Sequence, residues 1–150
     1  MTLEPPRELD ALVAEALGWT CRVMVRKAKS DSLRIGFQKW PKKKWPDSIC
    51  PDYGVWRLED GTKMDRATIA FCPYYSTSVA DAIAGLEAVV QKEKSEGVEV
   101  SYDIHKYRGD DGYRARLANP SMLYEGYEAT LPLAAATAIL AWAEAKKGGG

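Results

Sequence analysis

The sequence predicts an α+β fold: an α-β-α layered sandwich in which helices pack on a largely antiparallel sheet, with an insert rich in strands and loops. Two observations support this class. Three segments with a helical apolar pattern lie at 6–18, at 78–95 and after Thr130. Regions that contain alternating apolar and polar residues separate them, at 21–72, except for 40–54, and at 98–129. The turns between neighbouring strands are short, which is typical of antiparallel pairs.

The predicted helices have recognisable ends. The first, 6–18, ends at Gly18. The second begins at the N-cap residue Ser78 and ends before Gly97, and Thr130 caps the third. We expect their apolar stripes to face the core; these are Leu9, Leu12, Val13, Ala16 and Leu17 in the first, Val79, Ile83, Leu86 and Val90 in the second, and Leu131, Ala135, Ile139 and Trp142 in the third.

Three strands are predicted between the second and third helices. Residues 98–107 alternate, so Val98, Val100, Tyr102 and Ile104 share one face while Glu99, Ser101, Asp103 and His105 share the other. A turn at 109–112 leads to a return strand at 113–117, and a third strand follows at 122–129. We expect Arg114 and Arg116 of the return strand to lie across from Asp103 and His105.

The insert, residues 20–72, predicts further hairpins around a long irregular segment. Strands at 21–27 and 33–39 form one hairpin, and strands at 56–59 and 62–65 form another across Asp60-Gly61. A short strand follows at 67–72. Between the hairpins, prolines at 41, 46 and 51 exclude a central strand from 40–54.

Length and charge limit the possible functions. A chain of 150 residues with 46% hydrophobic and 28% charged residues predicts one globular domain, here 1–147, with 148–150 as a disordered tail. The net charge is zero, but residues 20–64 hold 11 Lys/Arg against 5 Asp/Glu, and each flank has an excess of three acids. This distribution argues against duplex nucleic acid as a partner and favours one basic patch for a small anion.

The cysteines and the N-terminus indicate a cytoplasmic protein without a membrane partner. The acidic start of the chain has no apolar run, and no segment reaches membrane-spanning length. Cys21, Cys50 and Cys72 are odd in number and widely spaced, which does not predict disulfides. With His105 they match a Cys₃His zinc site in number, but their spacing is wrong for one, so we expect neither a metal nor a cofactor.

Four segments resemble one known family. Residues 9–19 (LDALVAEALGW), 73–82 (PYYSTSVADA), 112–116 (GYRAR) and 128–134 (EATLPLA) are similar, in this order, to segments of the phage ABA-sandwich domain family. The resemblance covers 7–19 and 73–145, and residues 20–72 depart from it. It implies a small phage or prophage protein with an α-β-α layered fold, and it implies no reaction and no catalytic residues.

Catalysis is not expected from the residues themselves. His105 is the only histidine, and on its strand it follows Ser101 and Asp103 on one face. Such a row resembles a catalytic triad only in composition, because a triad needs its histidine between the two partners in space. A polar sheet face of mixed charge pairs is the favoured interpretation. The alternative is a nucleotide hydrolase that uses Asp103, His105 and the arginines opposite them.

The candidate ligand-binding residues combine flat aromatic rings with cations. Bases stack on Trp and Tyr, and Arg and Lys neutralise phosphates. The competing interpretation is that the rings pack beneath a long loop while the lysines are solvated. The candidates are Arg22, Arg26, Lys39, Trp40, Lys42, Lys43, Lys44, Trp45, Tyr53, Trp56, His105, Arg114 and Arg116.

Two functions from different classes remain open. The first is a non-catalytic, phage-encoded binding protein that sequesters a nucleotide-type immune signal in the cytoplasm of the infected bacterium, as a homo-oligomer by analogy with other small phage proteins. The second is a protein-interaction module that inhibits a host factor, with the insert as its interface and Trp and Arg as its main contacts.

Overall fold

The computed structural model describes residues 5–19, 22–27, 33–38, 55–58, 63–65, 69–106 and 112–148. The chain forms two compact units, one from 1–18 with 73–150 and the other from 19–72. We call them the helical unit and the strand unit. The strand unit coincides with the insert predicted at 20–72, and each unit is described by itself.

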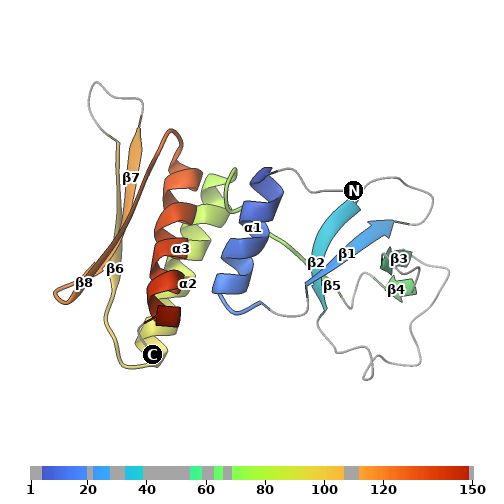
Figure 1. Ribbon diagram of the computed structural model, residues 1–150, viewed down its shortest axis with the longest axis horizontal. Coiled ribbons are helices and arrows are strands. Elements are labelled where there is room, and N and C mark those ends of the chain that lie inside the picture. The colour runs from blue at the N-terminus through green and yellow to red at the C-terminus, as the bar shows by residue number, and fades with distance from the viewer. Residues whose placement is uncertain are drawn as a thin grey trace. The chain divides into compact units, whose positions relative to one another are not determined.

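The helical unit contains three helices and a three-stranded sheet (Figure 1). The helices are α1 (Pro5–Ala16), α2 (Val79–Ser95) and α3 (Leu131–Gly148), and the strands are β6 (Ser101–Lys106), β7 (Tyr113–Asn119) and β8 (Met122–Glu128). The strands are antiparallel in the order β6-β7-β8. The predicted α+β class, with helices packed on an antiparallel sheet, is confirmed. The layers follow the order sheet, then α2 with α3, then α1.

The two faces of this sheet explain why the helices share one side. Ala115 and Leu117 of β7 are fully buried beneath α3, which contacts both β7 and β8. The other face carries charged side chains, which favour solvent over a second layer of helices. At Gly126 the approach of α3 is so close that a Cβ atom would collide with the Ala134 carbonyl oxygen. The alanines of α3 permit this approach: Ala134, Ala135 and Ala138 are fully buried.

Helix ends match the predicted signals. Ser78 is the N-cap of α2 and its hydroxyl accepts a hydrogen bond from the Asp81 amide at 3.3 Å. Gly18 follows α1 with φ of 100° and Gly97 follows α2 with φ of 82°, a region that favours glycine. Two stripe residues were predicted wrongly as buried. Leu12 is 45% exposed, because α1 buries Ala11, Val13 and Ala14 instead, and Val79 is 50% exposed in the first turn of α2.

Asp10 fastens α1 to the segment before α2. Its carboxylate is fully buried, pairs with Arg7 and accepts a hydrogen bond of 2.7 Å from the Ser76 amide. The Ser76 hydroxyl donates to the Pro6 carbonyl at 3.0 Å. Arg7 also donates to the Pro73 carbonyl at 3.1 Å and lies 4.0 Å from the centre of the Tyr74 ring. The segment from Pro73 to Ser76 is therefore a docking site for the first helix of the chain.

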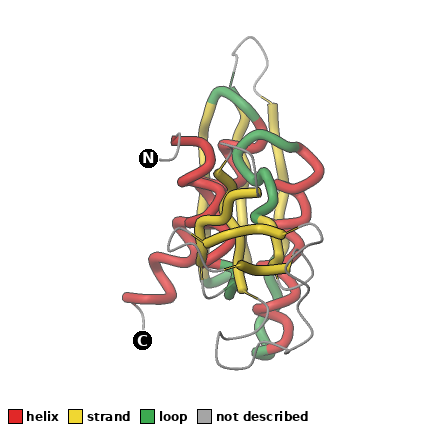
Figure 2. The backbone as a smooth tube through the Cα atoms, turned by 90° about the vertical axis from the view of Figure 1, so that its right-hand side faces the viewer, coloured by secondary structure: helices red, strands yellow, loops and turns green. Residues whose placement is uncertain are grey.

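The described residues of the strand unit form a five-stranded antiparallel sheet without helices (Figure 2). Its strands, in the order β4-β3-β1-β2-β5, are β1 (Arg22–Lys27), β2 (Leu33–Gln38), β3 (Val55–Leu58), β4 (Lys63–Asp65) and β5 (Ile69–Phe71). The two predicted hairpins are confirmed as β1–β2 and β3–β4. Ile35 and Phe37 of β2 are buried, and Trp19 packs edge-on against Phe37 with ring centres 5.3 Å apart. The segment 40–54 lies outside the described residues.

Candidate functional site

The solvent face of the β6-β7-β8 sheet carries a network of charges. The register opposes Asp103 to Arg116 and His105 to Arg114. Arg116 Nε and Nη2 donate to the two oxygens of Asp103 at 2.9 and 3.0 Å. His105 Nε2 lies 3.0 Å from Asp103 Oδ1 and 3.3 Å from Arg116 Nη2. The predicted face of mixed charge pairs is confirmed.

This network lowers the pKa of Asp103. The hydrogen bonds from Arg116 are the main cause. Burial is the next largest effect and raises the pKa, and the charges of Arg116, His105 and Arg114 each lower it by a smaller amount. The Ser101 hydroxyl donates to the Ala118 carbonyl at 3.4 Å rather than to the imidazole of His105. The three residues therefore form a row of charge and backbone contacts, and the histidine does not activate the serine.

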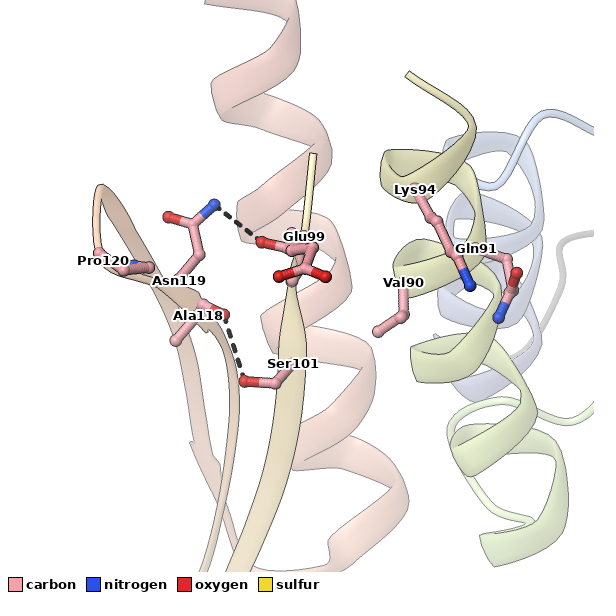
Figure 3. Close-up of a pocket in the computed structure, with 9 residues that line it drawn as sticks. Val90, Gln91, Lys94, Glu99, Ser101, Ala118, Asn119 and Pro120 are labelled. Atoms are coloured by element: carbon pink, nitrogen blue, oxygen red, sulfur yellow. Dashed lines mark hydrogen bonds between the residues drawn. The ribbon is translucent and has the colours of Figure 1, made fainter. Parts of the chain in front are cut away.

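A groove of about 430 Å³ lies between α2 and the start of β6 (Figure 3). It exists because α2 packs mainly on α3 and touches β6, an edge strand, only slightly. Asn119 Nδ2 donates to the Glu99 carbonyl at 3.1 Å, and the Ser121 amide donates to Asn119 Oδ1 at 2.8 Å, so the rim is fixed by hydrogen bonds. The lining residues are Val90, Gln91, Lys94, Glu99, Val100, Ser101, Ala118, Asn119 and Pro120.

The groove has the chemistry of a polypeptide site rather than of a phosphate site. One lysine and one glutamate balance its formal charge, and its other polar groups are amides and a hydroxyl. Valine, alanine and proline supply the apolar part of the surface. Such a lining can exchange hydrogen bonds with a main chain but offers no cluster of cations for a phosphate group.

A second pocket, of about 340 Å³, lies where the C-terminal parts of α2 and α3 meet the end of α1. Glu93 is 2% exposed and accepts a hydrogen bond of 3.3 Å from Trp142 Nε1. Lys146 Nζ lies 2.6 Å from the same carboxylate oxygen and 3.3 Å from Glu96 Oε2. The hydrogen bond to Glu93 is the main cause that raises the pKa of Lys146. These contacts join α2 to α3, so we assign them to stability.

In the strand unit, the register opposes cations to cations. Arg26 of β1 is opposite Arg57 of β3, and Arg57 is in turn opposite Lys63 of β4. The next row along the strands contains Lys27 and Trp56. Opposed positions of an antiparallel pair lie on one face of a sheet, so three cationic positions form a line across β1, β3 and β4. We call Arg26, Arg57 and Lys63 the cationic row.

The structure divides the predicted ligand-binding residues between the two units. His105, Arg114 and Arg116 come together on the solvent face of the helical unit. Arg22 and Arg26 lie on β1 and Trp56 on β3, all in the strand unit. Seven candidates lie outside the described residues: Lys39, Trp40, Lys42, Lys43, Lys44, Trp45 and Tyr53. Sequence reasoning did not name Arg57 and Lys63 as candidates, although the predicted Asp60-Gly61 hairpin places them on opposed strands.

Comparisons with known proteins leave the family open. Models of protein families, curated proteins and solved structures were all compared with the chain, and none matches. The resemblance to the phage ABA-sandwich family therefore stays a prediction. Neither a metal cluster nor a membrane-spanning helix is found in the described residues. Within those ranges, no three His, Cys, Asp or Glu side chains converge as metal ligands would. None of the helices in the described part of the chain has the length and apolar character needed to cross a membrane.

Proposed function

We propose that this chain is a non-catalytic, phage-encoded binding protein whose strand unit captures a nucleotide-type anion. In an infected bacterium, such a protein would sequester a nucleotide immune signal. The cationic row is the observation that carries the proposal. Like charges at directly opposed positions of a sheet are unfavourable, and a bound phosphate group turns the same arrangement into a favourable one.

The separation of charge between the units supports the same site. Residues 19–72 contain 12 Lys/Arg and 6 Asp/Glu, a formal charge of +6, whereas 1–18 with 73–150 contain 9 and 15, a formal charge of −6. The positive field is therefore concentrated on the unit that holds the cationic row.

Calorimetry with defined anions tests this function. We would titrate the full chain at low salt with ADP-ribose, with a cyclic dinucleotide and with pyrophosphate. The expected result is binding of at least one nucleotide that weakens as salt is raised and weakens about tenfold in Arg57→Gln, because a charged hydrogen bond is lost. The matched control is Arg34→Gln on β2, which is exposed, lies opposite Val25 outside the cationic row and should change the affinity by less than about twofold.

Two outcomes would contradict the proposal. If no probe gives binding heat at low salt, the proposed anion site is refuted. If Arg57→Gln and Arg34→Gln lower the affinity equally, the effect is one of overall charge and not of the cationic row. A separate measurement tests whether the bound nucleotide is hydrolysed. Chromatography of the nucleotide after incubation and heat release should recover it intact, and a hydrolysed product would favour the hydrolase alternative.

A protein-interaction function is the second candidate, and exposed apolar side chains on β8 favour it. Leu123 is 55% exposed and Tyr127 is 51% exposed. Both occupy outer-face positions of the register, on either side of Glu125. A host partner that co-purifies in stoichiometric amount at high salt, and that is lost in the double variant Leu123→Ser/Tyr127→Ser, would support this function over anion capture.

A further inference from the structure

We propose that β6 is a self-pairing edge: it adds in antiparallel fashion to β6 of a second copy, so that two three-stranded sheets become one sheet of six strands. This inference does not depend on anion binding, because it concerns the helical unit alone. It rests on the free edge of β6, on the order of charges along it and on the groove beside it.

The edge of β6 is open to another strand. In the order β6-β7-β8, one side of β6 faces β7, and within the described residues no other strand pairs with the opposite side. The strand is six residues long and contains no proline. An edge of this kind exposes main-chain N–H and C=O groups that can hydrogen-bond to a further strand.

The charges on β6 favour one register of self-pairing and disfavour the two adjacent registers. When a two-fold axis relates two identical antiparallel strands, directly opposed residues lie on the same face of the sheet. The axis therefore passes beside one central residue, which is opposite its own copy. Centres at Asp103 or His105 place like groups against each other. A centre at Ile104 places Asp103 against the partner's His105, and Tyr102 against the partner's Lys106. Every residue in this register, 102–106, belongs to β6.

The existing contacts leave room for this pairing. Asp103 is 44% exposed and His105 is 51% exposed at the edge of the network. Within its own chain, His105 lies 3.0 Å from the carboxylate of Asp103, 3.3 Å from Arg116 and opposite Arg114, so this part of the network holds two arginines and one carboxylate. A carboxylate from the second copy on its open side supplies an additional counter-charge. One row across the outer face would then contain, in order, Arg116, Asp103, the partner's His105 and the partner's Arg114.

Self-pairing also gives the groove a use. Because Tyr102 is opposite the partner's Lys106, the end of the second β6 lies next to Ser101, which lines the groove. The groove thus becomes a site shared by two copies, and its amides and hydroxyl border an incoming main chain, as its lining predicts. A two-fold axis perpendicular to the sheet keeps both α2 helices on one side of the six-stranded sheet.

Charge-swapped variants provide a sharp test. Asp103→Lys and His105→Asp each place like charges across the proposed interface of a homodimer. A mixture of the two variants restores complementarity, because the introduced lysine faces the introduced aspartate while the unchanged His105 faces the unchanged Asp103. Glu125→Lys, which makes the same charge change as Asp103→Lys but on β8, is the control.

Sedimentation analysis of the full chain would measure the result. We expect the unchanged protein and Glu125→Lys to be dimers, each swapped variant alone to be a monomer at the same concentration, and the mixture to form a heterodimer. Circular dichroism should show the same helix content in all samples. A monomeric unchanged protein, dimers that persist in both swapped variants, or a mixture that stays monomeric would each overturn the proposal.

Discussion

Replacing Lys146 by methionine should destabilise the helical unit by leaving the buried carboxylate of Glu93 without its cation. Glu93 is 2% exposed and Lys146 Nζ lies 2.6 Å from its Oε1 atom. Loss of one partner from a fully buried ion pair costs about 3–5 kcal/mol, since the remaining charge stays desolvated. Here Lys146 is 45% exposed and water can replace part of its interaction, so we expect a loss of about 2 kcal/mol.

A double-mutant cycle separates the charge from the hydrogen bond. Glu93→Gln removes the buried charge but keeps an amide oxygen as an acceptor for Trp142 Nε1, which donates to Glu93 at 3.3 Å. This variant should cost about 1 kcal/mol or less. In the double variant the buried charge is absent, so adding Glu93→Gln to Lys146→Met should recover stability rather than lose more.

Urea unfolding followed by far-ultraviolet circular dichroism is the suitable assay. The described helices all belong to the helical unit, so the helical signal reports on this unit. The reasoning fails if Lys146→Met costs no more than Glu93→Gln, or if the double variant is the least stable of the three. Either outcome would mean that Glu93 is sufficiently solvated without Lys146.

Three further predictions concern packing and charge. Gly126→Ala should destabilise the protein by about 3 kcal/mol, since the added methyl collides with the backbone of α3 at Ala134, whereas Gly148→Ala, with open space around it, should be neutral in the same thermal melt. Asp10→Ala should cost about 2–3 kcal/mol in urea unfolding, because it breaks the buried contacts of α1, and a loss below about 1 kcal/mol would contradict this role. The pKa of Asp103 is lowered in the folded protein, so its contribution to stability is present above the carboxyl's unfolded pKa and is lost as pH falls through the folded pKa. Nuclear magnetic resonance titration should show a midpoint below that of an ordinary aspartate, and an unshifted midpoint would refute the network's effect.

Features that depend on neighbours in the chain could be predicted from the sequence. Ser78 and Gly97 mark the ends of α2 because capping is a local property of the backbone. Asp103 and Arg116 could be placed together because a strand has a period of two and the connection between β6 and β7 is short. Both features can be predicted because they depend only on residues within one helix or one hairpin.

Features that depend on distant segments could not be predicted in this way. β1 pairs with β3 across about thirty residues, and no local signal specifies that pairing or its register. Register matters because a shift of one residue moves every position to the other face of a sheet. The burial of Asp10 and Glu93 is of the same kind, since their partners Ser76 and Trp142 come from other parts of the chain.

The arrangement of the cations changes how the predicted site should be understood. On the solvent face of the helical unit, Arg116 already has a carboxylate at 2.9 Å, so an anionic ligand would have to displace an existing partner. In the strand unit, Arg26 and Arg57 occupy opposed positions, and like charges at opposed positions are unfavourable. An anion on the helical unit would therefore compete with Asp103 for Arg116, and this is why we propose the strand unit as the anion site.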